Sequence, residues 1–220
     1  MMTYTEGIAF ILEGSTEKVF YLNLIKYLAS LDTGVSFEKN ISADDGEVFY
    51  VWQSNDKSIL IKMHVVGTVT QVVHSGRWFE NKCAKKHKLP WSVYLCYDTD
   101  SPNADVSKFY EGDWERLRNK LNKCKVNQII DLAASADIED IMLLDVQGVC
   151  NYLGIGVPET IRGRKGKAKM KNLFRSCGST YHEGEKAEAM IQMLDFEKII
   201  REAPIGLCGL QEKILKNEMS

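Results

Sequence analysis

The chain has 220 residues, of which 45% are hydrophobic and 26% charged, so it can bury one good core and does not belong to the disordered or fibrous classes. Its formal net charge of -2 provides no overall positive field, so a nucleic-acid surface would have to come from local clustering of basic residues. The six cysteines lack the C-x-x-C and short Cys–His spacings of zinc sites, and no leader or bilayer-length apolar run occurs, so we expect a cytoplasmic protein without a membrane partner.

The first part of the chain alternates short apolar runs with helical patterns. Apolar runs bounded by polar residues predict strands, whereas apolar residues three and four positions apart predict helices. In chain order, we expect a strand at 7–12, a helix that continues to about residue 31, a polar surface loop at 32–46, the two strands of a hairpin at 47–52 and 58–65, a helix at 68–86, and a buried strand at 91–97.

The remaining part is mainly helical. In chain order, we expect a loop at 98–107, a helix at 112–123, a strand at 126–133, a helix N-capped by Ser135, and helices at 168–177, 183–194 and 204–217. Because strands alternate with helices through the first two thirds, we predict an α/β fold with a mostly parallel sheet flanked by helices. We place the α/β domain at 1–154 and a helical extension, which completes it, at 155–220.

Acidic residues follow three of the predicted strands. Glu13 comes directly after the first strand, Asp98 and Asp100 follow the buried central strand, and Asp137 and Glu139 come after the last strand. The carboxyl ends of parallel strands meet at one edge of a sheet, and an extended backbone points Asp98 and Asp100 to the same side. Carboxylate oxygens are the ligands of hard cations, so this placement predicts a site for Mg²⁺ or Mn²⁺.

Each of these acids also has a purely structural interpretation. Glu17 lies one turn into the first helix, where it serves either as a ligand or as part of the helix cap. Asp137 and Glu139 stand at a helix start, where negative side chains favour the positive end of the helix dipole. The joint placement of acids at three strand ends favours the metal site over these alternatives.

Residues 162–175 form the one plainly basic stretch, with seven lysines and arginines and no acid. Basic side chains on a glycine-bearing loop that enters a helix suit contacts to a phosphate backbone. The alternative is a helix whose lysines face water opposite an apolar stripe. We favour nucleic-acid contact, and the residues predicted to make it are Arg162, Arg164, Lys165, Lys167 and Lys171.

Three segments resemble motifs of a known family. Residues 10–21, with the sequence FILEGSTEKVFY, resemble the first motif of the Toprim domain, in the form found in the overcoming-lysogenisation-defect (OLD) nucleases and in small stand-alone Toprim proteins. Residues 94–100 are similar to the D-x-D motif that this family places on a strand. Residues 135–140 resemble the serine-plus-acid motif that follows a later strand in OLD-type domains. The resemblance covers residues 7–153, with long unmatched stretches between the motifs.

The resemblance implies a metal-dependent endonuclease that hydrolyses phosphodiester bonds in DNA or RNA with two Mg²⁺ or Mn²⁺ ions. Glu13 would bind a metal or act as general base, and Glu17 would complete that end of the site. Asp98 and Asp100 would hold the catalytic ion. The second ion would be held by the acids of the third motif, Glu139 with Asp137.

The family also uses a late lysine to stabilise developing charge, and here Lys169 is chosen over Lys167 and Lys171. OLD nucleases carry an ABC-type ATPase, but the chain has no G-x-x-x-x-G-K-[ST] sequence, so a separate ATPase partner is expected, as in anti-phage defence systems. The helical tail is a possible surface for a homo-oligomer. The alternative function is a non-catalytic metal- or nucleic-acid-binding subunit that works with such an ATPase.

Overall fold

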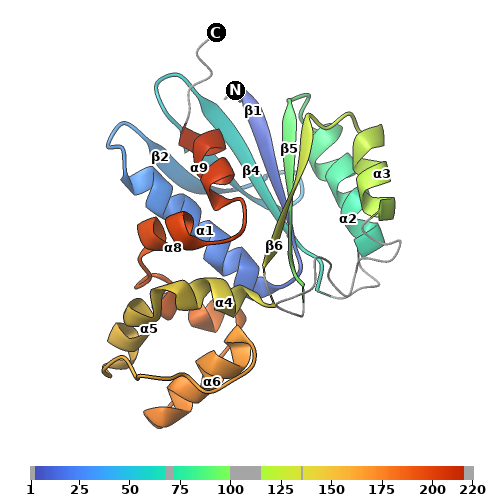
Figure 1. Cartoon of the computed structure of the whole chain (residues 1–220). Helices are drawn as coiled ribbons and strands as arrows, with labels where there is room; N and C mark the ends of the chain where they lie inside the picture. Colours follow the sequence, from blue (N-terminus) through green and yellow to red (C-terminus); the bar gives the residue numbers. More distant parts are fainter. Residues whose placement is uncertain (1–2, 68–71, 100–114, 135, 216–220) are drawn as a thin grey trace.

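A single mixed sheet forms the centre of the molecule (Figure 1). The computed structural model describes residues 3–67, 72–99, 115–134 and 136–215. The strands are β1 (Glu6–Leu12), β2 (Ser36–Ile41), β3 (Val48–Gln53), β4 (Ser58–Val65), β5 (Trp91–Asp98) and β6 (Gln128–Ala134), and they lie in the order β2-β3-β4-β1-β5-β6. β4, β1, β5 and β6 are parallel, whereas β2 and β3 add an antiparallel edge. The predicted α/β fold with a mostly parallel sheet is confirmed.

Helices cover both faces of the sheet and its carboxyl edge (Figure 1). One face carries α1 (Ser15–Ser30), α8 (Phe196–Glu202) and α9 (Leu207–Leu215), and the other carries α2 (Val72–Phe79), a π-helical turn (Glu80–Ala84) and α3 (Glu115–Lys123). Beyond the carboxyl edge lie α4 (Ile138–Met142), α5 (Val146–Leu153) and α6 (Gly166–Ser176), and α7 (Glu188–Ile191) connects them to α8. Within the described residues, no helix combines the length and the apolar character needed to span a bilayer.

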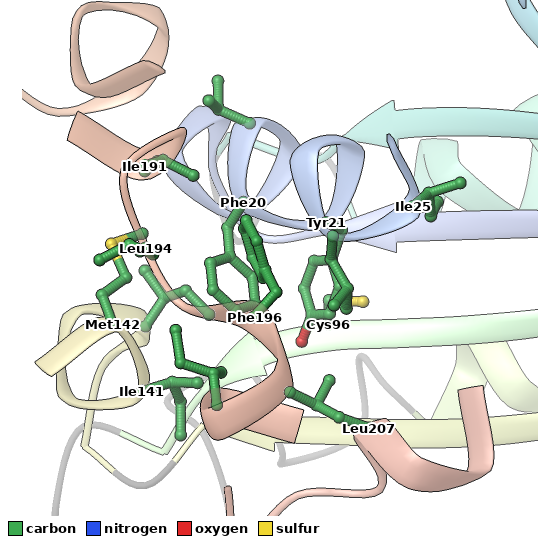
Figure 2. Close-up of a cluster of buried hydrophobic side chains, with 14 of the residues drawn as sticks. Phe20, Tyr21, Ile25, Cys96, Ile141, Met142, Ile191, Leu194, Phe196 and Leu207 are labelled. Carbon is green, nitrogen blue, oxygen red and sulfur yellow. The ribbon is translucent and has the colours of Figure 1, made fainter. Parts of the chain in front are cut away.

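The sheet separates two apolar cores. Side chains alternate along a strand, so Phe10 of β1 belongs to the core with α1, whereas Ile11 belongs to the core with α2 and α3. The larger core joins the sheet to the helices after residue 154. In Figure 2, Phe20 of α1 lies against Phe196 of α8, with 5.6 Å between the ring centroids. The predicted helical extension therefore shares one core with the sheet.

The structure differs from the sequence prediction at β2, which lies inside the predicted surface loop 32–46. Most of its side chains are exposed, so its local pattern is polar and predicts a loop. Phe37 is half-buried, pairs across the strands with Trp52, and stacks on Tyr50 at 5.5 Å between ring centroids. Edge pairing with β3 makes this segment a strand, and that pairing is a property of the sheet.

Aspartates begin two helices after β6 at positions that the sequence analysis did not predict. Asp145 N-caps α5 and accepts a hydrogen bond from Gly148 N at 3.2 Å. Asp195 caps α8, a helix that the sequence did not predict, by accepting a bond from Lys198 N at 3.0 Å. The predicted N-cap Ser135 lies outside the described residues, and the observed N-cap of α4 is Asp137.

Candidate acid-lined site at the carboxyl edge of the sheet

Four acidic side chains, which we call the acid cluster, interact at the carboxyl edge of the sheet. They are Glu13 after β1, Glu17 in the first turn of α1, Asp98 at the end of β5, and Glu139 in α4. Parallel pairing places the end of β1 beside β5, and Glu13 Oε2 accepts a hydrogen bond from the backbone amide of Asp98 at 3.1 Å. The carboxyls at the two strand ends are therefore neighbours, as the sequence predicted.

Burial and mutual repulsion raise the pKa values within the acid cluster. Burial is the largest cause for Asp98, whose pKa is raised to about 9, and the charges of Glu17 and Glu13 add to the shift. Burial also raises the pKa of Glu17 to about 7. Burial and then the charge of Asp137 raise the pKa of Glu139. Near neutral pH, some carboxyls of the acid cluster are therefore protonated. These protons neutralise negative charge that a bound cation would otherwise balance.

Asp98 carries a buried oxygen that the fold does not satisfy. Its Oδ1 finds no hydrogen-bond partner among the described residues. A buried carboxylate oxygen without a donor is costly, because it has lost its water and gained nothing in exchange. A hard divalent cation is the ligand that such an oxygen, surrounded by further carboxyls, would favour.

The carboxylates of the acid cluster are the kind of ligand that a divalent cation prefers, but their side chains are too far apart to coordinate one ion together. In the described part of the chain, no group of three His, Cys, Asp or Glu side chains is close enough together to hold a metal ion. Electrostatic coupling extends over longer distances than coordination, which is why the same acids raise one another's pKa values. The predicted ligand Asp100 lies outside the described residues. Metal binding would require the side chains of the acid cluster to move closer together.

Asp137 joins the N-termini of two helices. Its Oδ1 accepts hydrogen bonds from Asp140 N in α4 at 3.2 Å and from Lys167 N in α6 at 3.1 Å, and its Oδ2 lies 3.1 Å from Lys167 N. Gly166 allows this contact, because a Cβ there would collide with Asp140 N and Asp137 Oδ1. Asp137 thus satisfies amides at two helix starts. Its predicted role as a metal ligand would compete with these bonds.

Glu139 is oriented by a tyrosine that the sequence analysis missed. The Tyr181 hydroxyl donates a hydrogen bond to Glu139 Oε1 at 2.9 Å, and both residues are buried. Tyr181 lies 42 residues further along the chain, between α6 and α7, and belongs to no motif. Its position carried no signal, because only the packing of these helices brings the pair together.

Thr99 connects the end of β5 to the turn that leads into α4. Its backbone amide donates to Ala134 O at 3.0 Å, and its Oγ1 accepts from Ala136 N at 2.9 Å. Ala136 has φ 69°, a left-handed conformation that costs an L-residue roughly 1–2 kcal/mol. These bonds hold the turn against β5, so that α4 starts beside the acid cluster.

Lys167 is the lysine that interacts with the acid cluster. It pairs with Glu183 at 2.8 Å, and its positive charge also interacts with Glu139 and Asp98. The predicted Lys169 instead binds Asp140 Oδ1 at 3.0 Å, and Lys171 lies 3.6 Å from Glu183. The geometry therefore favours Lys167 over Lys169 as the cationic residue of the site.

The other basic residues predicted to contact nucleic acid lie at or before the start of α6. Arg162 and Arg164 are exposed, and Lys165 takes the N-cap position without a side-chain capping bond. The apolar stripe opposite them is buried, with Met170, Leu173 and Phe174 inside the larger core. A helix whose basic side chains only face water would have the same arrangement, so the geometry does not distinguish that alternative from contact with nucleic acid.

Comparison with known proteins identifies no family. No family model matches the chain, and no curated protein does. Among solved structures, native futalosine hydrolase of Helicobacter pylori matches with 10% identity and a TM-score of 0.30, covering 90% of this chain and 98% of that chain. The 5'-methylthioadenosine/S-adenosylhomocysteine nucleosidase of Helicobacter pylori, bound to butyl-thio-DADMe-Immucillin-A, matches with 12% identity and a TM-score of 0.30, covering 91% and 100%. Similarity this weak assigns no activity to this chain.

The predicted function of a Toprim-type two-metal nuclease is wrong. The described residues form no group of three side chains close enough to hold an ion, and both Asp137 oxygens accept a backbone amide. The physical reason for the error is that carboxylates at helix starts serve as caps as readily as ligands. The Toprim resemblance of the three motifs stays a prediction that these comparisons do not test.

Proposed function

We propose that this protein is a divalent-cation-dependent enzyme that hydrolyses a phosphate ester of a small molecule, with Mg²⁺ or Mn²⁺ as its cofactor. The observation that supports this most strongly is the buried Asp98 carboxyl, whose Oδ1 has no hydrogen-bond partner among the described residues and which is surrounded by other acids. A cluster of this kind stores repulsion that a bound cation would relieve.

A phosphate ester is the substrate class that the charges favour. The acid cluster alone would repel an anion, whereas a cation bound there would attract one. When bound, Mg²⁺ or Mn²⁺ would polarise the phosphoryl oxygens and lower the pKa of an attacking water. Lys167 stands beside the cluster and would add positive charge where negative charge develops on those oxygens.

The acids would divide the remaining work between binding and proton transfer. Asp98 and Glu13 end neighbouring strands and would hold the cation. Glu17, with its pKa raised to about 7, is suited to accept the proton of the attacking water near neutral pH. The water oxygen then forms a bond to phosphorus, the ester P–O bond breaks, and the leaving alcohol takes up a proton. Tyr181 and Thr99 would orient the site without touching the substrate.

The test combines cation binding with turnover. Calorimetric titration with Mn²⁺ should show binding to the wild type that Asp98→Asn abolishes and Asp44→Asn preserves, because the Asp44 side chain is 83% exposed and lies outside the site. Hydrolysis of p-nitrophenyl phosphate should require Mg²⁺ or Mn²⁺ and stop with EDTA. Unchanged Mn²⁺ binding by folded Asp98→Asn, or metal-independent turnover, would refute the proposal.

The expected partners stay predictions. An ABC-type ATPase, a homo-oligomeric contact through the helical tail, and a nucleic acid at the basic segment 162–175 are not tested by any contact in the structure. Co-purification from the native host, together with the mass of the protein in solution, would test the first two. Salt-dependent retention on an immobilised polyanion, compared between wild type and Arg164→Glu, would test the third.

A further inference from the structure

A groove of about 720 Å³ opens between α1 and the antiparallel edge of the sheet. Phe37 of β2 and Tyr50 of β3 line it, and apolar residues of α1 such as Val19 and Leu22 contribute to its wall. The groove exists because the antiparallel hairpin widens the sheet beyond the strands that α1 contacts most closely. Its volume is in the range of sites for drug-sized ligands and cofactors.

Two aromatic rings in the groove provide a flat apolar surface. Phe37 and Tyr50 stack with 5.5 Å between centroids and an interplanar angle of 19°, and Phe37 keeps part of its surface exposed. Tyr50 is only 5% exposed and lines the groove beside Phe37. The exposed part of Phe37 therefore offers a flat apolar surface on which a planar ring can stack.

Cations without partners also line the groove. Lys18 of α1 and Lys39 of β2 form no ion pair with any residue that the structure describes, whereas Lys26 pairs with Glu188 at 3.2 Å. One acid, Glu185, is likewise unpaired in the described chain. Lys39 stands two residues after Phe37, on the same face of the strand. Free positive charge therefore adjoins the aromatic surface.

We propose that this groove binds a nucleotide. The planar base would stack on the exposed face of Phe37, and the phosphate would be bound by Lys39 and Lys18. Aromatic side chains favour nucleobases because every base has a π-face, and unpaired lysines favour phosphate. A purely apolar occupant would leave both cations without an anionic partner.

The groove and the acid cluster are separate sites on either side of the first turn of α1. Ser15 lines the groove, whereas Glu17, two residues on, belongs to the acid cluster. Residues two apart on a helix point in different directions. The nucleotide site therefore stands on its own residues, and it does not depend on the cation or on the proposed hydrolysis.

Titration with a fluorescent ATP analogue in EDTA, with AMP as unlabelled competitor, tests the proposal without the metal. We expect Lys39→Glu to weaken binding about 10-fold or more, because it removes a charge-assisted contact and adds repulsion. Phe37→Leu should weaken binding about 5-fold or more through lost stacking. Lys88→Glu, a change at an exposed lysine before β5 that does not line the groove, is the matched control and should bind as the wild type does.

The remaining outcomes separate this proposal from the alternatives. Asp98→Asn should bind the nucleotide unchanged, so a failure of phosphate ester hydrolysis leaves this test intact. Equal competition by adenosine and AMP would mean an apolar groove without a phosphate site, and equal competition by ribose 5-phosphate would mean that the ring is not recognised. Either result, or no binding at millimolar nucleotide, would overturn the proposal. Because Lys39 is exposed, its substitution leaves the core intact, and near-ultraviolet circular dichroism checks Phe37→Leu.

Discussion

The amino edge and the carboxyl edge of the parallel strands differ in whether their buried charges have opposite charges beside them. At the amino edge, Glu6 is buried and pairs with Lys57 at 2.7 Å and with Lys213 at 2.5 Å. Lys57 is also buried and donates a further hydrogen bond to Lys213 O at 2.7 Å. Each charge at this edge therefore has an opposite charge within the same chain.

At the carboxyl edge, the buried charges share one sign. Glu17, Asp98 and Glu139 form no ion pair with any described residue, and burial together with their mutual repulsion raises their pKa values. Lys167 interacts with them, but its direct ion-pair partner is Glu183. An edge that neutralises its own charges contributes to stability, whereas an edge that leaves them unbalanced sacrifices stability and gains a place for a cation.

Removing a charge at the amino edge should have the largest effect on the free energy of unfolding. Lys57→Met leaves buried Glu6 with only one lysine, and we expect a loss of about 3 kcal/mol in the free energy of unfolding. Urea denaturation followed by tryptophan fluorescence measures it. The double variant Glu6→Gln/Lys57→Met should recover part of the loss, since it removes the buried carboxylate that Lys57 paired with, while Lys213 gives up its ion pair with Glu6. A single-variant loss of less than about 1 kcal/mol would contradict a compensated edge.

The carboxyl edge should make stability fall as the pH rises. The folded-state pKa values of Asp98 and Glu17, about 9 and about 7, lie above their usual values of 3.8 and 4.5, so the folded state binds more protons than the unfolded state between these limits. Stability is thus fully present below about pH 4 and is lost as the pH rises through 7 and 9. We expect a decrease on the order of 2 kcal/mol between pH 5 and pH 8 in EDTA, measured by chemical denaturation.

Mg²⁺ should oppose this decrease, because cation binding requires the deprotonated carboxyls. The increase in melting temperature on adding Mg²⁺ should therefore grow from pH 6 to pH 8, with proton release on binding. A pH-independent effect of Mg²⁺ would show that the ion binds elsewhere.

Asp98→Asn should stabilise the metal-free protein. The amide keeps the shape of the side chain and removes the cost of protonating Asp98 on folding, which grows as the pH rises above its unfolded-state pKa, so we expect a gain of about 1–2 kcal/mol at pH 8 and a smaller gain at pH 5. Thermal unfolding in EDTA measures the difference, and Asp44→Asn is the neutral surface control. Destabilisation at pH 8 would mean that the Asp98 carboxyl makes favourable interactions within the fold. The carboxyl edge would then resemble the amino edge, where buried charges are paired.

Tyr181→Phe should have the smallest effect on stability. It removes the hydroxyl bond to Glu139 and should cost about 1 kcal/mol. Its larger consequence should be a cation affinity about 10-fold weaker, because the orientation of Glu139 is lost. Calorimetric Mn²⁺ titration provides the comparison. An unchanged affinity would remove Glu139 from the cation site and leave the strand-end acids Glu13 and Asp98.

Prediction from sequence succeeded where the signal is local. The run that ends at Leu12 is a buried strand, and the helix begins directly after it at Ser15. Strands four and five have almost the predicted bounds, because their β-branched and aromatic runs end in polar residues. Acids at the ends of β1 and β5 were expected to be neighbours, and the bond from Asp98 N to Glu13 confirms it.

Prediction could not reach what residues distant in the sequence decide. Asp137 was predicted as a metal ligand from its place after a strand, and this role stays a prediction, but its oxygens also accept an amide 30 residues away, across the α4–α6 contact, which no local pattern indicates. The same contact directs Lys169 to Asp140 and leaves Lys167 facing the acid cluster. The nuclease function was inferred from motif order, and motif order alone does not distinguish a cap from a ligand.

The amino-acid sequence by itself determined the alternation of strands and helices and the placement of acids at strand ends, because periodicity and chain polarity are local properties. Only the tertiary structure decided which acids are compensated. Glu6 meets its lysines from the start of β4 and from α9, whereas Glu17, Asp98 and Glu139 approach one another from α1, β5 and α4. The free energy of a buried charge depends on its neighbours in space, and those neighbours are set by how the elements pack.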